Sequence, residues 1–183
     1  MVFRFLLLSD EVDDFRREIQ IDADGSFLDL HKAITQSVGY KDGEMTSFFI
    51  CNDDWEKERE ITLFEMDTTS EEDSFVMDGS RLGDFLEDEK QKLMYVFDYM
   101  TERAFFMELR EIITGKNMDE AVCTKSIGDA PAQFVDFESF ENSAQSFESG
   151  ENFYGDESYD LDELDADGFD GLDNIISGED EGF

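Results

Sequence analysis

The acidic residues of this chain are unevenly distributed, and this constrains its organisation more than any other feature. Residues 136–183 contain 17 acidic residues and no Lys or Arg, whereas residues 1–135 hold the other 32 acidic and all 14 basic residues, a net charge of −18. Single aromatic residues are scattered through the acidic part without forming a run that could build a core. We therefore expect a folded domain at 1–134 and a disordered acidic tail at 135–183.

The whole chain carries a formal charge of −35, which restricts its partners. Such a charge repels phosphate backbones and anionic membranes and attracts basic proteins. We expect a basic protein partner, no direct binding of nucleic acid and no membrane association. The aromatic residues of the tail are the predicted docking residues: Phe137, Phe140, Phe147, Phe153, Tyr154, Tyr159 and Phe169.

Metal and cofactor sites are not predicted. Cys51 and Cys123 form no Cys-x-x-Cys pair, and the chain has one His, too few for a usual zinc site. In the tail, Glu163–Gly168 has the spacing of a calcium loop, but Asn174 stands where a bidentate carboxylate is needed. The apolar run Phe5–Leu8 is too short for a signal-peptide core, so we expect a cytoplasmic protein.

Hydrophobic spacing predicts two strands and a helix at the start of the chain. Residues 1–8 are apolar and indicate a strand buried on both faces, and residues 15–21 alternate as an antiparallel second strand. A helix over 26–38 follows. Ser26 suits its N-cap, Asp29 suits the capping position three residues later, and Gly39 suits a left-handed stop.

The rest of the domain is predicted to be mainly strands. These cover 46–51, 60–66, 93–99 and 104–113, with an exposed loop at 68–73 and a short second helix capped by Ser80. In the strand at 93–99, the alternation places Leu93, Tyr95, Phe97 and Tyr99 on one face. The fold class is therefore α+β, a mainly antiparallel mixed sheet with one principal helix and a β-grasp-like start.

Several short motifs resemble a known family. The Phe15-Arg16-Arg17 triplet precedes a helix that begins with Phe27, Asp29, Leu30 and His31, and a later strand contains Tyr95, Phe97 and Asp98. In this order they resemble the plasmid pRiA ORF-three-like family, also described as insertion-element passenger TnpR-like proteins, over roughly residues 1–130. The Gly, Trp and His that usually follow the family's later strand are missing. The acidic tail is not part of the pattern.

The candidate site residues each have two readings. His31 is either a general base or ligand, or a helix residue hydrogen-bonded to a neighbouring strand or loop. Arg16 and Arg17 either bind an anion or pair with carboxylates of the protein itself. Asp98 completes the set as a possible ligand-binding residue, and no catalytic residue is assigned.

Three functions remain open at this stage. The leading hypothesis is a non-enzymatic interaction protein whose acidic tail docks on a basic partner or on its own domain. The second is a DNA mimic, whose carboxylates imitate phosphates and inhibit a DNA-binding protein. The third is an enzyme or small-ligand protein, which requires His31, Arg17 and Asp98 to converge on a pocket.

Overall fold

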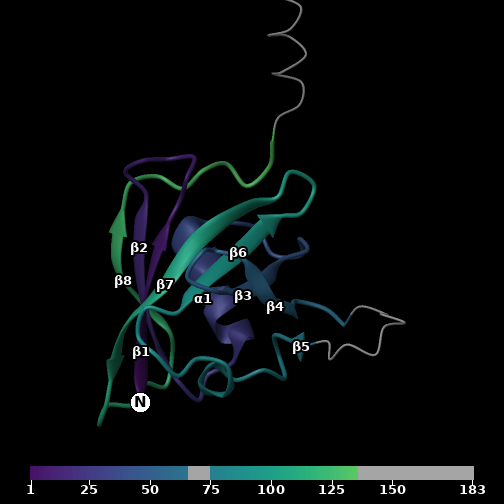
Figure 1. The fold of residues 1–183 in the computed structure, drawn as a ribbon. Helices are drawn as coiled ribbons and strands as arrows, with labels where there is room; N and C mark the ends of the chain where they lie inside the picture. The colour runs from purple at the N-terminus through teal and green to yellow at the C-terminus, as the bar shows by residue number, and fades with distance from the viewer. Residues whose placement is uncertain (66–74, 136–183) are drawn as a thin grey trace, which may run out of the picture. The chain divides into compact units, whose positions relative to one another are not determined.

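The computed structural model describes residues 1–65 and 75–135. Within this part of the chain the strands form one eight-stranded sheet in the order β5-β4-β3-β6-β7-β1-β2-β8 (Figure 1). Neighbouring strands are antiparallel except β4 and β5, which are parallel. The strands are β1 Val2–Leu8, β2 Arg16–Asp22, β3 Ser47–Cys51, β4 Lys57–Thr62, β5 Phe75–Val76, β6 Lys92–Asp98, β7 Arg103–Ile113 and β8 Val122–Ile127.

The helix α1 (Phe27–Val38) has the ends that the sequence predicts. The side chain of Ser26 accepts a hydrogen bond from the N–H of Asp29, and the Asp29 carboxylate accepts one from the N–H of Ser26. This capping box satisfies backbone donors that a helix N-terminus otherwise leaves free. Gly39 ends the helix in the left-handed region, with φ 71°. One sheet and one principal helix confirm the α+β class.

The core lies between α1 and one face of the sheet. Side chains alternate across a strand, so every second residue of the central strands points toward the helix. Phe27 of α1 packs 5.3 Å from Phe48 of β3, measured between ring centroids. Further residues of this core are Phe3, Phe5, Leu7, Ile19, Ile21, Leu30, Ile34, Ile50, Leu93, Tyr95, Phe97, Phe105, Met107 and Leu109, all of them buried.

The opposite side of the sheet is called here the helix-free face, because no helix of the described residues packs on it. β1 lies near the middle of the sheet, between β2 and β7. Its residues toward α1 are fully buried, and Val2 and Leu6 on the helix-free face are also buried. At the end of the strand, however, Leu8 is 43% exposed. The prediction of a strand buried on both faces therefore holds for most of β1.

The structure corrects several predicted boundaries. The second helix is a single 3₁₀ turn, η1 (Leu82–Asp84); its N-cap is Arg81, and no side chain caps it. Ser80 is buried, and its backbone oxygen accepts from Phe27. The strand expected at 60–66 is β4, which begins earlier and ends at Thr62. β5 and β8 were not predicted.

A bulge explains a further difference at the end of β6. The pairing register with β7 shifts between Val96 and Asp98. Tyr99 consequently leaves the core face on which Leu93, Tyr95 and Phe97 lie. Its hydroxyl donates to Glu60 Oε1 at 2.6 Å and also contacts the Ser47 hydroxyl.

The acidic tail and the loop predicted at 68–73 lie outside the described residues. The predicted boundary after residue 134 falls at the end of the described range and stays a prediction. None of the helices in the described part of the chain has the length and apolar character needed to span a membrane.

Candidate functional site

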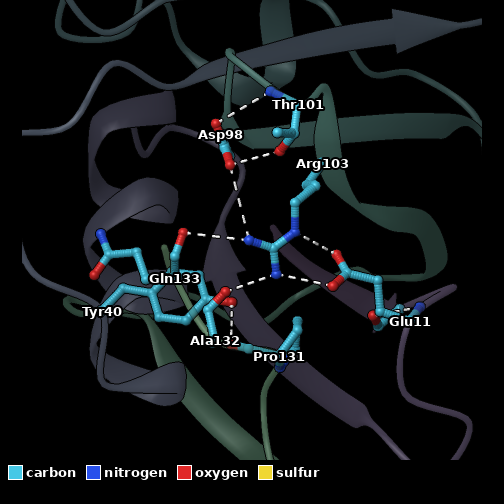
Figure 2. Close-up of polar contacts among 9 residues, drawn as sticks. Glu11, Tyr40, Asp98, Thr101, Arg103, Pro131, Ala132 and Gln133 are labelled. Carbon is cyan, nitrogen blue, oxygen red and sulfur yellow. Dashed lines mark hydrogen bonds and ion pairs between the residues drawn. The ribbon is translucent and has the colours of Figure 1, made fainter. Parts of the chain in front are cut away.

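Arg103, the first residue of β7, joins four segments of the domain (Figure 2). Its Nε and Nη2 atoms donate to the two carboxylate oxygens of Glu11, each at 2.8 Å. Its Nη1 atom lies 3.8 Å from a carboxylate oxygen of Asp98. The same guanidinium donates to the backbone oxygens of Ala132, at 2.6 Å, and Gln133, at 3.5 Å. A two-pronged Arg–carboxylate pair fixes orientation as well as charge.

The surroundings of Arg103 and Asp98 favour the charged forms of both side chains. The hydrogen bond to Glu11 raises the pKa of Arg103. Burial would raise the pKa of Asp98, but hydrogen bonds from Thr101 and from the N–H of Met100, together with Arg103, lower it overall. Arg103 and Asp98 are therefore fixed charges rather than proton donors near neutral pH.

Residues after α1 hold the same C-terminal segment from the other side. The hydroxyl of Tyr40 donates to the backbone oxygen of Pro131 at 2.7 Å. The side-chain amide of Gln133 accepts from the N–H of Lys41 at 2.8 Å and donates to its oxygen at 2.9 Å. Burial raises the pKa of Tyr40, so its hydroxyl stays protonated and keeps donating. Pro131 itself is buried.

Arg17 fixes the beginning of this segment. It is 4% exposed, and its guanidinium donates to the backbone oxygens of Ile127, Gly128, Ser37 and Arg16 at 2.6–3.3 Å. The sequence predicted either a bound anion or carboxylate partners for this residue. Instead, backbone carbonyl oxygens accept the hydrogen bonds of the guanidinium. Since β8 pairs with β2, the oxygens at the end of β8 lie close to Arg17.

Gly128 is needed where the segment leaves β8. Its φ is 67°, and a Cβ atom would lie 2.5 Å from the backbone oxygen of Asp14. Only glycine allows this close approach. Residues 127–133, fixed by Arg17, Arg103, Tyr40 and Lys41, are called here the C-terminal anchor. The acidic segment begins three residues after it.

His31 has the second of its predicted readings, a helix residue bonded to a neighbouring strand. It is 5% exposed, its Nδ1 lies 2.8 Å from the Tyr95 hydroxyl of β6, and the Thr46 hydroxyl lies 3.4 Å away. Burial lowers the pKa of His31 and raises that of Tyr95, so both side chains are neutral near pH 7.

The predicted site residues do not converge. A groove of about 670 Å³ lies between α1 and the β7–β8 loop. Its lining does not include His31, Arg17 or Asp98. The residues that line it are mostly acidic or apolar: Ile21, Asp22, Asp24, Gly25, Asp29, Lys32, Ala33, Gln36, Asn117, Met118, Asp119, Glu120 and Ala121. Of the candidates, Arg17 contacts the C-terminal anchor, Asp98 contacts Arg103, and His31 lies in the core.

Two further predictions concern Arg16 and the tail. Arg16 lies opposite Leu8 of β1 in the strand register and has no carboxylate within salt-bridge distance in the described part of the chain. The docking aromatic residues predicted in the tail lie outside the described residues. Residues 1–65 and 75–135 hold no group of three or more His, Cys, Asp or Glu that could bind a metal ion.

Sequence reasoning did not select Glu11, Tyr40, Arg103 or Gln133. Their contacts join residues about 30 to 92 positions apart, which no local spacing reveals. One signal was available: Arg103 is an isolated basic residue just after the turn that follows Asp98, in a chain dominated by carboxylates.

Comparison with known proteins agrees with the motif analysis. A family model described as plasmid pRiA4b ORF-3-like protein matches residues 5–170. The chain belongs to this family. The match continues past residue 130, where the motifs end, and so includes much of the acidic segment that the motif pattern had left out.

A solved structure resembles the fold of the chain. It is the crystal structure of a protein of unknown function from Methanosarcina mazei Go1, with a TM-score of 0.51 and 21% sequence identity over 68% of each chain. At this identity the likeness concerns the fold alone. No curated protein matches the chain.

Proposed function

We propose that this chain is a non-enzymatic protein-interaction module whose acidic segment, residues 136–183, binds a basic partner. The observation that carries the proposal is the C-terminal anchor. Two arginines, a tyrosine and a pair of amide hydrogen bonds hold residues 127–133 on the domain. The acidic segment thus follows directly on residues that are hydrogen-bonded to the domain.

The composition of the segment supports a basic partner. Its 17 carboxylates attract Lys and Arg, and its isolated aromatic residues can be buried against apolar parts of the same surface. The place of His31 weighs against the alternative of an enzyme built on this residue. The only histidine of the chain is hydrogen-bonded inside the core and lies outside the lining of the groove.

Affinity capture with the full chain tests the proposal. The matched control replaces Phe137, Phe140, Phe147, Phe153, Tyr154, Tyr159 and Phe169 by Ser and keeps every carboxylate. We expect the native chain to retain a basic protein from an extract of its source cells, and the serine variant to retain at least about tenfold less. A variant lacking Asp136–Phe183 should retain none.

Equal capture by the native chain and the serine variant would contradict the proposal, because charge alone would then account for binding. The DNA-mimic alternative predicts that duplex DNA displaces the captured protein competitively, with a strong dependence on salt. Docking on the chain's own domain predicts instead that NMR signals of residues 1–135 shift when Asp136–Phe183 is deleted.

A further inference from the structure

The helix-free face of the sheet carries a continuous apolar row. In the strand register, Leu8 of β1 lies opposite Phe106 of β7, Phe106 opposite Met94 of β6, and Met94 opposite Phe49 of β3. Leu8 is 43% exposed, and the other three are partly exposed. Since neighbouring strands lie about 4.8 Å apart, the row is roughly 14 Å long.

Trp55 contacts this row at Phe106 of β7, and two lysines lie beside the row. The Trp55 ring meets the Phe106 ring edge-on, with 5.1 Å between the centroids. The Nζ atom of Lys92 lies 5.0 Å from the Trp55 ring, and that of Lys57 lies 4.4 Å from the Phe49 ring. Lys92 Nζ also donates to the backbone oxygen of Asp53, and a cation over an aromatic face leaves its remaining N–H groups available to a further acceptor.

The cations around the row lack acidic partners. Arg16 lies opposite Leu8 at the other end, and in residues 1–65 and 75–135 no carboxylate lies within salt-bridge distance of Arg16, Lys57 or Lys92. Glu108 lies opposite Lys92 in the strand register, but its carboxylate pairs with Arg110 instead. Charge complementarity at this face therefore favours an acidic ligand.

We infer that this face binds an acidic peptide segment of a partner protein, one that presents aromatic or aliphatic side chains among its carboxylates. The apolar side chains would cover the row from Leu8 to Phe49, and the carboxylates would meet Arg16, Lys57 and Lys92. The negative charge of the domain opposes such a partner at long range, but salt screens that field beyond about 8 Å at physiological ionic strength. At contact distance, attraction to the three cations outweighs the repulsion from the rest of the domain.

This inference is independent of the proposed function, because it concerns a different surface and a partner of opposite charge. Trp55 is the only tryptophan of the chain, so its fluorescence reports on this face in the full protein. The probes are two synthetic peptides without Trp: one of Asp with spaced Phe, the other with Ser in place of each Phe. We expect the Phe peptide to change the Trp55 emission saturably and the Ser peptide to have no such effect.

Charge-reversal variants localise the binding. The double variant Lys57→Glu with Lys92→Glu should weaken the Phe peptide at least about tenfold, read as the midpoint of the titration. Lys32→Glu on α1, the matched control on the other side of the sheet, should change it less than about twofold. If the double variant does not fold, Lys57→Gln with Lys92→Gln serves in its place. No response to the Phe peptide, an equal response to the Ser peptide, or unchanged affinity in the double variant would overturn the inference.

Discussion

His31 illustrates how burial determines what a residue can do. The side chain sits in the core as the hydrogen-bond partner of Tyr95, with the Thr46 hydroxyl nearby. Burial disfavours the charged imidazolium, so the pKa of His31 is lowered from its ordinary value of 6.5. The charges that oppose or reinforce this effect, Asp42 and Lys32, are secondary. The residue therefore stabilises the fold in its neutral form.

This predicts a pH dependence of stability. In the unfolded chain His31 binds a proton as the pH falls through about 6.5, whereas the folded chain binds it only at lower pH. The unfolded state therefore binds more protons in this window, and the free energy of unfolding falls as the pH falls. Urea midpoints measured between about pH 7.5 and 5.5 should decrease for the native chain.

The control for this prediction is His31→Gln, which keeps a polar side chain but cannot titrate. The variant starts from a lower stability because the bond to Tyr95 changes, so the slopes with pH are compared rather than the absolute values. The slope should be clearly smaller in the variant. Equal slopes would show that carboxylates account for the pH dependence in this range.

At this scale the sequence predicts a residue's environment better than its partners. The alternation of residues 15–21 correctly placed Arg17 on the buried face with Phe15 and Ile19. The alternation could not predict that the backbone carbonyls of Ile127 and Gly128 would accept hydrogen bonds from the Arg17 guanidinium. Those oxygens come within reach only because β8, which was not predicted, pairs with β2.

Among the elements, the helix was predictable and the edge of the sheet was not. The boundaries of α1 follow from local hydrogen bonds of Ser26 and Asp29, which the sequence encodes within four residues. β8 has an exposed pattern, and without apolar alternation it resembles a loop. It is a strand because the edge of β2 offers unpaired backbone groups. Long-range pairing of this kind has no local signature.

The C-terminal anchor gives an element-scale prediction. Arg103→Lys keeps the positive charge but cannot form the two parallel hydrogen bonds to Glu11 while also donating to Ala132. Since the Arg103 side chain is only 13% exposed, we expect a loss of about 1–2 kcal/mol in the free energy of unfolding. We also expect faster hydrogen exchange at the Lys41 amide, which donates to Gln133.

Arg110→Lys is the matched control, because Arg110 lies on the same strand and its ion pair with Glu108 is half exposed. That change should cost less than about 0.5 kcal/mol and leave the Lys41 amide unaffected. If Arg103→Lys loosens no amide near residues 127–133, Arg103 does not hold the C-terminal anchor, and Arg17, Tyr40 and Lys41 hold it without Arg103.

At the scale of the whole molecule, the net charge was the easiest property to predict from the sequence, and the pairing of charged side chains was the hardest. Composition gives −35 directly, and −18 for residues 1–135. It does not show which cations are neutralised. Arg103 is paired with Glu11 and Asp98, while Arg16, Lys57 and Lys92 have no carboxylate at salt-bridge distance in the described residues. That distinction needs the sheet register, because strand pairing decides which side chains become neighbours.

The net charge predicts that added salt stabilises this protein. Like charges repel one another over the surface of the folded domain, and salt screens that repulsion more than it weakens a partly buried pair such as Arg103 with Glu11. The thermal midpoint of the full chain should therefore rise with NaCl concentration. A variant with Asp13→Asn, Glu44→Gln and Glu58→Gln, three exposed residues, should show a smaller rise, because it carries three fewer negative charges. A midpoint that falls with salt would mean that attraction within the ion pairs outweighs repulsion, and the domain would then be held together by its few cations rather than in spite of its many carboxylates.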